Sequence, residues 1–206
     1  MLSLEEGTLA VRTARRVIEE FIKTNKTPKV ELPESFGELS GVFVTLKEDG
    51  ELRGCIGYPY PDLPLSKALV DAAVQASTQD PRFERVRTAE LSKIDVEVTV
   101  LSEPELLKAK PLDRPKHIKI GRDGIIVEHG LYRGLLLPQV PVEQRWGTEE
   151  YLEYGCLKAG ISPDAWVDEQ TKVYTFQGQI FQEKTPGGEV VEKKIDAALD
   201  KCETKK

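Results

Sequence analysis

Two stretches of this sequence repeat the same order of residues, and this repetition constrains the fold more than any other feature. The stretches are GVFVTLKEDGELRGCIG at 41–57 and GIIVEHGLYRGLLLP at 124–138. Each has a leading glycine, three apolar β-type residues, a turn and an Arg-Gly pair, so the pair at 53–54 aligns with that at 133–134. Each is followed by a helical pattern, a polar segment with a proline and another strand pattern. We therefore predict an internal duplication of a β-β-α-β unit.

The individual elements follow from local patterns. Ser3 and Glu6 form a capping-box pattern before a run of apolar residues at helical spacing, which predicts a helix over about 4–23. In the strand at 94–102, valines alternate with polar residues, so we expect Asp95 and Glu97 on a face open to water. The other expected elements are strands at 41–46, 51–58, within 124–138 and at 172–183, and helices at 64–78 and 148–160, the last with Thr148 as N-cap and Gly160 after its end.

Together these elements predict an α+β fold in which two β-β-α-β units form one largely antiparallel sheet with packed helices. We expect one domain over residues 1–185, made of the N-terminal helix and two intimate repeats at about 41–102 and 124–183. Residues 186–206 are predicted to be a charged C-terminal tail or surface helix.

Composition excludes several classes of function. The chain has 206 residues, a net charge of −6 and a pI of about 5.2, which argues against non-specific nucleic-acid binding. It has no signal-peptide pattern and no apolar run near the roughly 18 residues that a membrane span needs, so we expect a cytoplasmic protein without membrane contact. Abundant Glu and Lys beside a single asparagine are typical of thermophile proteins.

The cysteines and histidines predict neither a disulfide framework nor a metal site. There are three cysteines, Cys55, Cys156 and Cys202, and an odd number fits a reducing compartment. With only His117 and His129 added, no metal-ligand spacing is present, and we expect no cofactor.

The strand ELRGCIGY contains the most reactive residue types in the chain. Alternation places Leu52 and Ile56 toward the core and Arg53 and Cys55 together on the opposite face. A guanidinium nearby favours the thiolate and lowers the pKa of a cysteine, which makes Cys55 and Arg53 candidate catalytic residues.

Two interpretations of Cys55 stay open. Gly54 and Gly57 leave the backbone accessible, so a ligand could approach the thiol closely. A free cysteine is also a common small apolar core residue, and the second repeat has Leu135 at the matching position, which favours packing.

Two loops are further candidates for ligand binding. Asp80 and Arg82 follow a predicted helix, where they could bind an anion or form a salt bridge to their own scaffold. Gln139, Gln144 and Trp146 lie between a strand and a helix, where they could line a pocket or belong to a loop that its tryptophan holds in place.

The motifs LRGCIG, DPRF, GRDGI, LPQV with EQ and a tryptophan, and KAGI occur in an order that resembles the AMMECR family over roughly residues 8–183. The resemblance implies an α+β fold with a duplicated unit and a barrel-like sheet, and a stand-alone archaeal type of member. It places Arg53, Gly54, Cys55 and Gly57 in the family signature. Many members have glycine before the tryptophan, where this chain has Arg145.

The resemblance implies no established reaction. Prokaryotic members are often encoded beside, or fused to, a Memo-like protein and a radical SAM protein, which are therefore the expected partners. The first hypothesis is a binding module for a small molecule, a peptide or a partner protein. The alternative is a cysteine-dependent enzyme with Cys55 as nucleophile or covalent carrier and Arg53 as its stabiliser.

Overall fold

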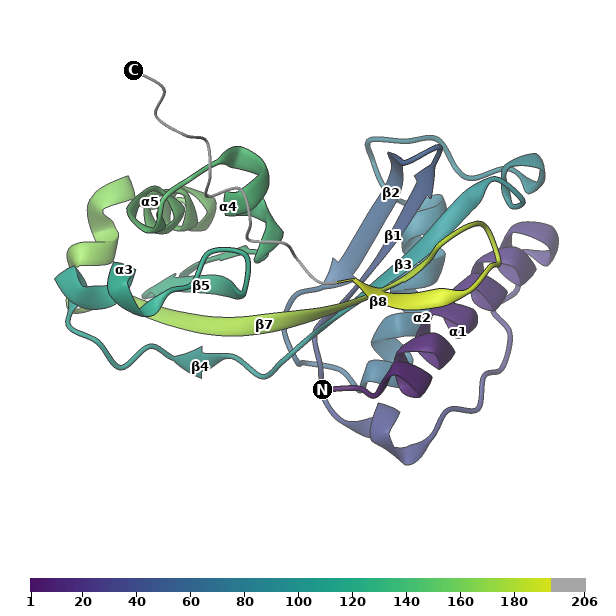
Figure 1. Ribbon diagram of the computed structural model, residues 1–206, viewed down its shortest axis with the longest axis horizontal. Helices are drawn as coiled ribbons and strands as arrows, with labels where there is room; N and C mark the ends of the chain where they lie inside the picture. Colours follow the sequence, from purple (N-terminus) through teal and green to yellow (C-terminus); the bar gives the residue numbers. More distant parts are fainter. Residues whose placement is uncertain (194–206) are drawn as a thin grey trace, which may run out of the picture. The chain divides into compact units, whose positions relative to one another are not determined.

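The computed structural model describes residues 1–193 (Figure 1). The chain divides into two compact units. The first contains Met1–Leu101 and the segment that begins at Gln179, and the second contains Ser102–Gly178. Both units combine helices with antiparallel strands, which confirms the predicted α+β class.

The first unit is a β-sheet with two helices packed on one of its faces (Figure 1). The β1–β2 hairpin turns through Asp49 and Gly50, whose φ angles of 53° and 83° suit the Asp-Gly pair that the sequence supplies. The predicted capping box is present, because the Ser3 and Glu6 side chains each accept a hydrogen bond from the other's backbone N–H. The elements are α1 (Leu4–Thr24), β1 (Val42–Glu48), β2 (Glu51–Tyr58), α2 (Leu65–Thr78), β3 (Ile94–Leu101) and β8 (Val190–Lys193).

The second unit packs α5 (Thr148–Ala159) against β5 (Asp123–His129) and β6 (Tyr132–Leu136). Gly160 follows the end of α5, as predicted, and has a left-handed φ of 79°. The N-cap is Gly147 and not Thr148, and the Gly147 N–H donates to the Glu150 carboxylate at 2.8 Å. The remaining elements are β4 (Glu105–Leu106), α3 (Arg114–His117), α4 (Gln139–Gln144) and β7 (Lys172–Glu183). Short 3₁₀ turns lie at Glu34–Gly37, Thr88–Glu90, Pro111–Asp113 and Pro163–Val167.

Strand β7 contributes to both units. The strand order is β2-β1-β3-β7-β5-β6, and β4 and β8 also pair with β7. Its first half pairs with β4 and β5, whereas Ile180–Glu183 pair with β8. Each unit has the order strand, strand, helix, strand that the repeated pattern suggested, and a common origin of the two stays a prediction.

The structure corrects three expectations. Residues 190–193 form strand β8 and not a tail or helix, because they pair with β7, and the rest of the expected tail, including Cys202, lies outside the described residues. The loop after β6 contains the short helix α4. Glu97 and Thr99 are only 8% and 3% exposed, whereas Asp95 is partly exposed, so the expectation that Glu97 is open to water is wrong.

Candidate functional site

A β-bulge reorganises the signature strand β2. Leu46 pairs with Gly54, but Lys47 pairs with Leu52, so Arg53 is an extra residue in β2. An extra residue reverses the alternation beyond it. Leu52 therefore shares a face with Cys55, and it is 40% exposed. The prediction that Leu52 points to the core is wrong for this reason.

Arg53 is held by the segment that follows α2. Its Nε and Nη2 donate to the two oxygens of Glu90 at 2.7 and 3.3 Å, and its Nη1 donates to the Glu84 carbonyl at 2.9 Å. The guanidinium in turn lowers the pKa of the Glu90 carboxyl. Arg53 thus holds residues 84–90 against β2 through three hydrogen bonds.

Asp80 and Arg82 satisfy the outer edge of β2 at Cys55. The Asp80 side chain is 2% exposed and accepts the Cys55 backbone N–H at 2.8 Å. Arg82 donates to both Asp80 oxygens at 3.0 and 2.8 Å and to the Cys55 carbonyl at 3.3 Å. Arg82 is the main reason that the pKa of Asp80 lies far below its usual range. Because β2 ends the strand order, this pair replaces the neighbouring strand that β2 lacks there.

The Cys55 thiol is partly buried and lies between Thr45 and Arg82. Thr45 Oγ1 donates to its sulfur at 3.3 Å. Burial raises the pKa of the Cys55 thiol, and the Thr45 hydrogen bond and the charge of Arg82 offset only part of that rise. The prediction that Arg53 lowers this pKa is therefore wrong, since the cation that acts on the thiol is Arg82.

Cys55 belongs to a row of side chains across three strands. It pairs with Thr45 on β1, which pairs with Glu97 on β3, and Lys47 Nζ lies 2.8 Å from the Glu97 carboxylate. Sequence reasoning missed Thr45 and Lys47 and treated Glu97 as solvent-exposed. Their alternation was visible, but only the strand register shows that they meet at Cys55. We call this the signature face and define it by Phe43, Thr45, Lys47, Leu52, Cys55, Gly57, Glu97 and Thr99.

The signature glycines make room for the protein and not for a ligand. A Cβ on Gly54 would lie 2.3 Å from the Ala76 carbonyl of α2. A Cβ on Gly57 would lie 2.5 Å from the Phe43 ring. In the second unit a Cβ on Gly134 would lie 2.4 Å from the Ala159 nitrogen of α5. These contacts correct the expectation of an open backbone, because close strand–helix and strand–ring packing fills the space.

The residues of the third motif lie in the second unit and are described by themselves. The Trp146 ring stacks on Tyr154 of α5 with centroids 3.8 Å apart, which fastens the turn after α4. Gln144 is exposed, and Gln139 Oε1 is buried without a hydrogen-bond partner in the described chain. Arg145 has φ 58°, a left-handed conformation that suits the glycine found in many family members.

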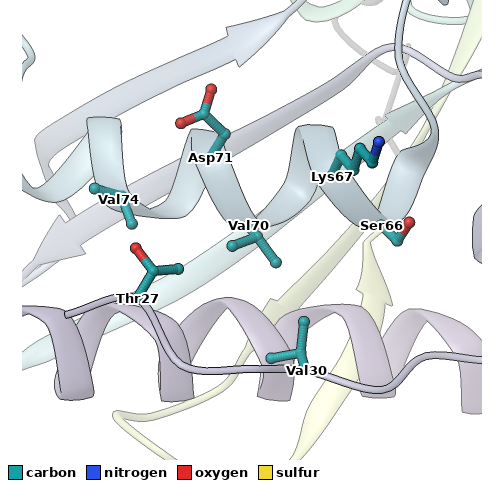
Figure 2. A pocket seen from close by; sticks show the side chains of 7 residues that line it. All are labelled: Thr27, Val30, Ser66, Lys67, Val70, Asp71 and Val74. Carbon is teal, nitrogen blue, oxygen red and sulfur yellow. The ribbon is translucent and has the colours of Figure 1, made fainter.

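A hollow that no motif indicated lies between α2 and the segment near Thr27 and Val30 (Figure 2). Val70 and Val30 point toward each other across it, and Asp71 lies at its rim. The Asp71 carboxylate accepts hydrogen bonds from Tyr58 and Gln75.

Residues 1–193 contain neither a membrane-spanning helix nor a metal-binding cluster. No helix there has the length and apolarity needed to cross a membrane. Within the same residues, no three His, Cys, Asp or Glu side chains are arranged to hold a metal ion.

Comparison with known proteins gives one consistent result. A protein of Methanocella arvoryzae is 66% identical over 197 residues, covering 95% of this chain and all of that protein. Protein MJ0810 of Methanocaldococcus jannaschii is 54% identical over 198 residues, covering 95% and 98%. The crystal structure of the uncharacterized protein PH0010 from Pyrococcus horikoshii matches with a TM-score of 0.84 and 49% identity, covering 92% of this chain and 97% of that one. The model of the AMMECR1 family matches residues 11–181, and the chain belongs to this family.

Proposed function

We propose that this chain is a cytoplasmic binding protein whose signature face binds a small molecule, a peptide or a partner protein. In this proposal Cys55 contributes packing and shape. The Memo-like and radical SAM proteins that the family resemblance implies are the first partners to test.

The state of Cys55 supports this proposal more than any other observation. Burial raises the pKa of its thiol, which disfavours the thiolate that a nucleophile needs. The two arginines near it are already engaged, Arg53 by Glu90 and Arg82 by Asp80. Leu52 lies on the same face and is 40% exposed. An exposed apolar side chain of this kind suits binding.

The alternative, a cysteine-dependent enzyme, has one specific observation in its favour. The Thr45 hydroxyl and the charge of Arg82 both act on the sulfur in the direction of the thiolate. Glu97, in the same row, supplies the carboxylate that a general base would need. A substrate that excludes water or adds positive charge at the signature face would strengthen these effects.

Alkylation separates the two functions. We expect iodoacetamide to modify Cys55 slowly in the folded protein, with a midpoint above the ordinary value of about 8.5, read by peptide mass spectrometry. Cys156 is the buried comparison, since it is fully buried and its pKa is raised to about 11. Fast modification of Cys55 with a midpoint below about 8.5 would favour the enzyme.

Variants then test binding directly. With purified Memo-like and radical SAM proteins as probes, Cys55→Ser should keep the affinity, whereas Leu52→Asp should weaken it at least tenfold by placing a charge in the contact. Leu112→Asp is the matched control, because Leu112 is 74% exposed and lies outside the signature face. Equal effects of the two Asp variants, or no binding by the unmodified chain, would contradict this choice of surface and partners.

A further inference from the structure

One face of strand β3 carries three hydrogen-bond acceptors at alternate positions, Asp95, Glu97 and Thr99. Alternation along a strand puts all three on one side of the sheet, which is the side of the signature face. Glu97 and Thr99 belong to that face, and Asp95 extends it beside Lys47, its partner in the strand register. Neighbouring members of this row are about 7 Å apart along β3.

The Thr99 hydroxyl is buried without a hydrogen-bond partner. Thr99 is only 3% exposed, and its side chain forms no hydrogen bond with any residue of the described chain. Its neighbour across the strands is Phe43, whose ring cannot supply the missing partner. A buried polar group without a partner costs stability, so its presence in a folded protein needs an explanation. A ligand that supplies the missing hydrogen bond is such an explanation.

The two carboxylates of the row are also incompletely paired. Lys47 Nζ binds one oxygen of Glu97 at 2.8 Å, and no donor within residues 1–193 binds the other oxygen. Asp95 forms no hydrogen bond or salt bridge with these residues, and its Oδ1 is buried without a partner. This part of the face therefore has two carboxylates for one ammonium group. Because the unpaired groups are acceptors beside a net negative charge, they fit a cationic hydrogen-bond donor.

An apolar contact lies within reach of these acceptors. Lys47 pairs with Asp95 on one side and with Leu52 of β2 on the other. Since adjacent strands are about 4.8 Å apart, Leu52 and Asp95 are about 10 Å apart across the face. A peptide segment that covers the exposed Leu52 can therefore extend a long basic side chain to Asp95. Arginine suits this position, because its planar guanidinium presents five donors in a geometry that matches carboxylates.

We propose that the signature face binds an extended peptide segment of a partner protein through an arginine side chain. The guanidinium donates to Asp95 and to the free oxygen of Glu97, a further N–H of the peptide donates to the Thr99 hydroxyl, and an apolar residue of the peptide covers Leu52. This inference rests on the proposed function and names the chemistry of the partner that the same face binds.

The test uses the synthetic peptide acetyl-Leu-Arg-Leu-Arg-Leu-amide as its probe. The peptide is titrated into the full-length protein, and the backbone amide signals are followed by NMR. We expect saturable shifts for residues 95–99 and none for helix α5 of the second unit. The matched peptide carries citrulline in place of arginine, which keeps the shape and removes the charge. It should bind about tenfold more weakly.

Two variants locate the contact. Asp95→Asn should weaken binding of the arginine peptide about tenfold, as expected for a lost hydrogen bond to a charged group. Asp62→Asn, which removes an exposed acid outside the signature face, should leave the affinity unchanged. Thr99→Val should weaken binding about fivefold without lowering the midpoint of thermal unfolding, since the hydroxyl has no partner in the described chain. A lower midpoint would give that hydroxyl a structural role and overturn its part in the proposal.

Further outcomes separate this inference from the proposed function. Partner proteins that bind the parent chain and Asp95→Asn equally, but lose affinity for Leu52→Asp, would overturn the inference and leave the proposed function standing. Equal binding of the arginine and citrulline peptides, or shifts spread over both units, would also overturn the inference. An absence of binding by every protein and peptide probe would overturn both.

Discussion

At the scale of the residue, Asp80 shows how one side chain can complete a sheet edge. Its carboxylate accepts the Cys55 N–H, and Arg82 donates to both of its oxygens. A carboxylate that would be costly to bury alone therefore has a hydrogen-bond partner on each oxygen. The sequence showed that Asp80 and Arg82 lie in one turn. It could not show that their partner is the backbone of Cys55, 25 residues earlier, because that contact depends on tertiary packing.

The first prediction concerns Asp80→Asn. We expect it to lower the free energy of unfolding at pH 7 by about 2 kcal/mol, since hydrogen bonds to a charged group are lost. The folded-state pKa of Asp80 is lowered, so its stabilisation is present above the unfolded value and is lost as the pH falls. The difference from the parent should therefore shrink below about pH 4. Urea titrations at pH 7 and pH 3 measure this, and a constant difference would contradict it.

The second prediction concerns Arg145→Gly. Because Arg145 has a left-handed φ of 58°, glycine there should raise the free energy of unfolding by about 0.5–1 kcal/mol. Lys158→Gly in α5 is the control and should lower it by about 1 kcal/mol. Thermal unfolding of both variants measures the pair, and a destabilised Arg145→Gly would show that the side chain contributes contacts that outweigh its backbone conformation.

At the scale of the element, local signals were sufficient for most of the fold. The β1–β2 turn, α1, α2 and β7 were predicted within a few residues, because an Asp-Gly turn, a capping box and apolar periodicity act over short distances. The bulge at Arg53 and strand β8 were not predicted. Both depend on a partner strand: residues 190–193 are two valines followed by Glu and Lys, a segment too short to identify as a strand until β7 is beside it.

The candidate site was predicted less completely than the fold. Sequence motifs identified β2 and the Asp80 turn, but they assigned Arg53 to the thiol when it in fact binds Glu90. Thr45 and Glu97 were missed because membership of the signature face is set by register across β1 and β3.

The third prediction concerns the contacts between strands and helices. Gly54→Ala and Gly134→Ala should each lower the free energy of unfolding by about 1–3 kcal/mol, because the new methyl groups meet helix backbone at 2.3 and 2.4 Å. Gly37→Ala is the control, since no atom lies within 4 Å of its added Cβ. Denaturant titrations compare the three, and a neutral Gly54→Ala would mean that α2 can shift away from β2 without cost.

At the scale of the whole molecule, a buried ion pair joins distant parts of the chain. Arg15 of α1 donates to both oxygens of Glu183 at the end of β7, at 2.6 and 2.5 Å, and Val96 N–H donates to the same carboxylate. The Glu183 side chain is fully buried. Removal of one partner would leave the other charged and buried, which is strongly destabilising.

The fourth prediction follows for Glu183→Gln. We expect the free energy of unfolding to fall by about 3–5 kcal/mol. Trp146 and Trp166 are both in the second unit, so tryptophan fluorescence reports that unit alone, whereas Glu183 is in the first. Because β7 belongs to both units, we expect the fluorescence and circular dichroism transitions to shift together. A shift in circular dichroism without one in fluorescence would show that the units unfold separately.

The division of β7 between the units also determines the order in which the protein can be completed on the ribosome. Residues 1–101 emerge first, but the segment that completes their unit begins only at Gln179. Until then α1 exposes an arginine whose carboxylate partner is 168 residues away in the nascent chain. Since domains form as their residues emerge, residues 102–178 are synthesised while the first unit is still open. The N-terminal half is therefore synthesised first and completed last.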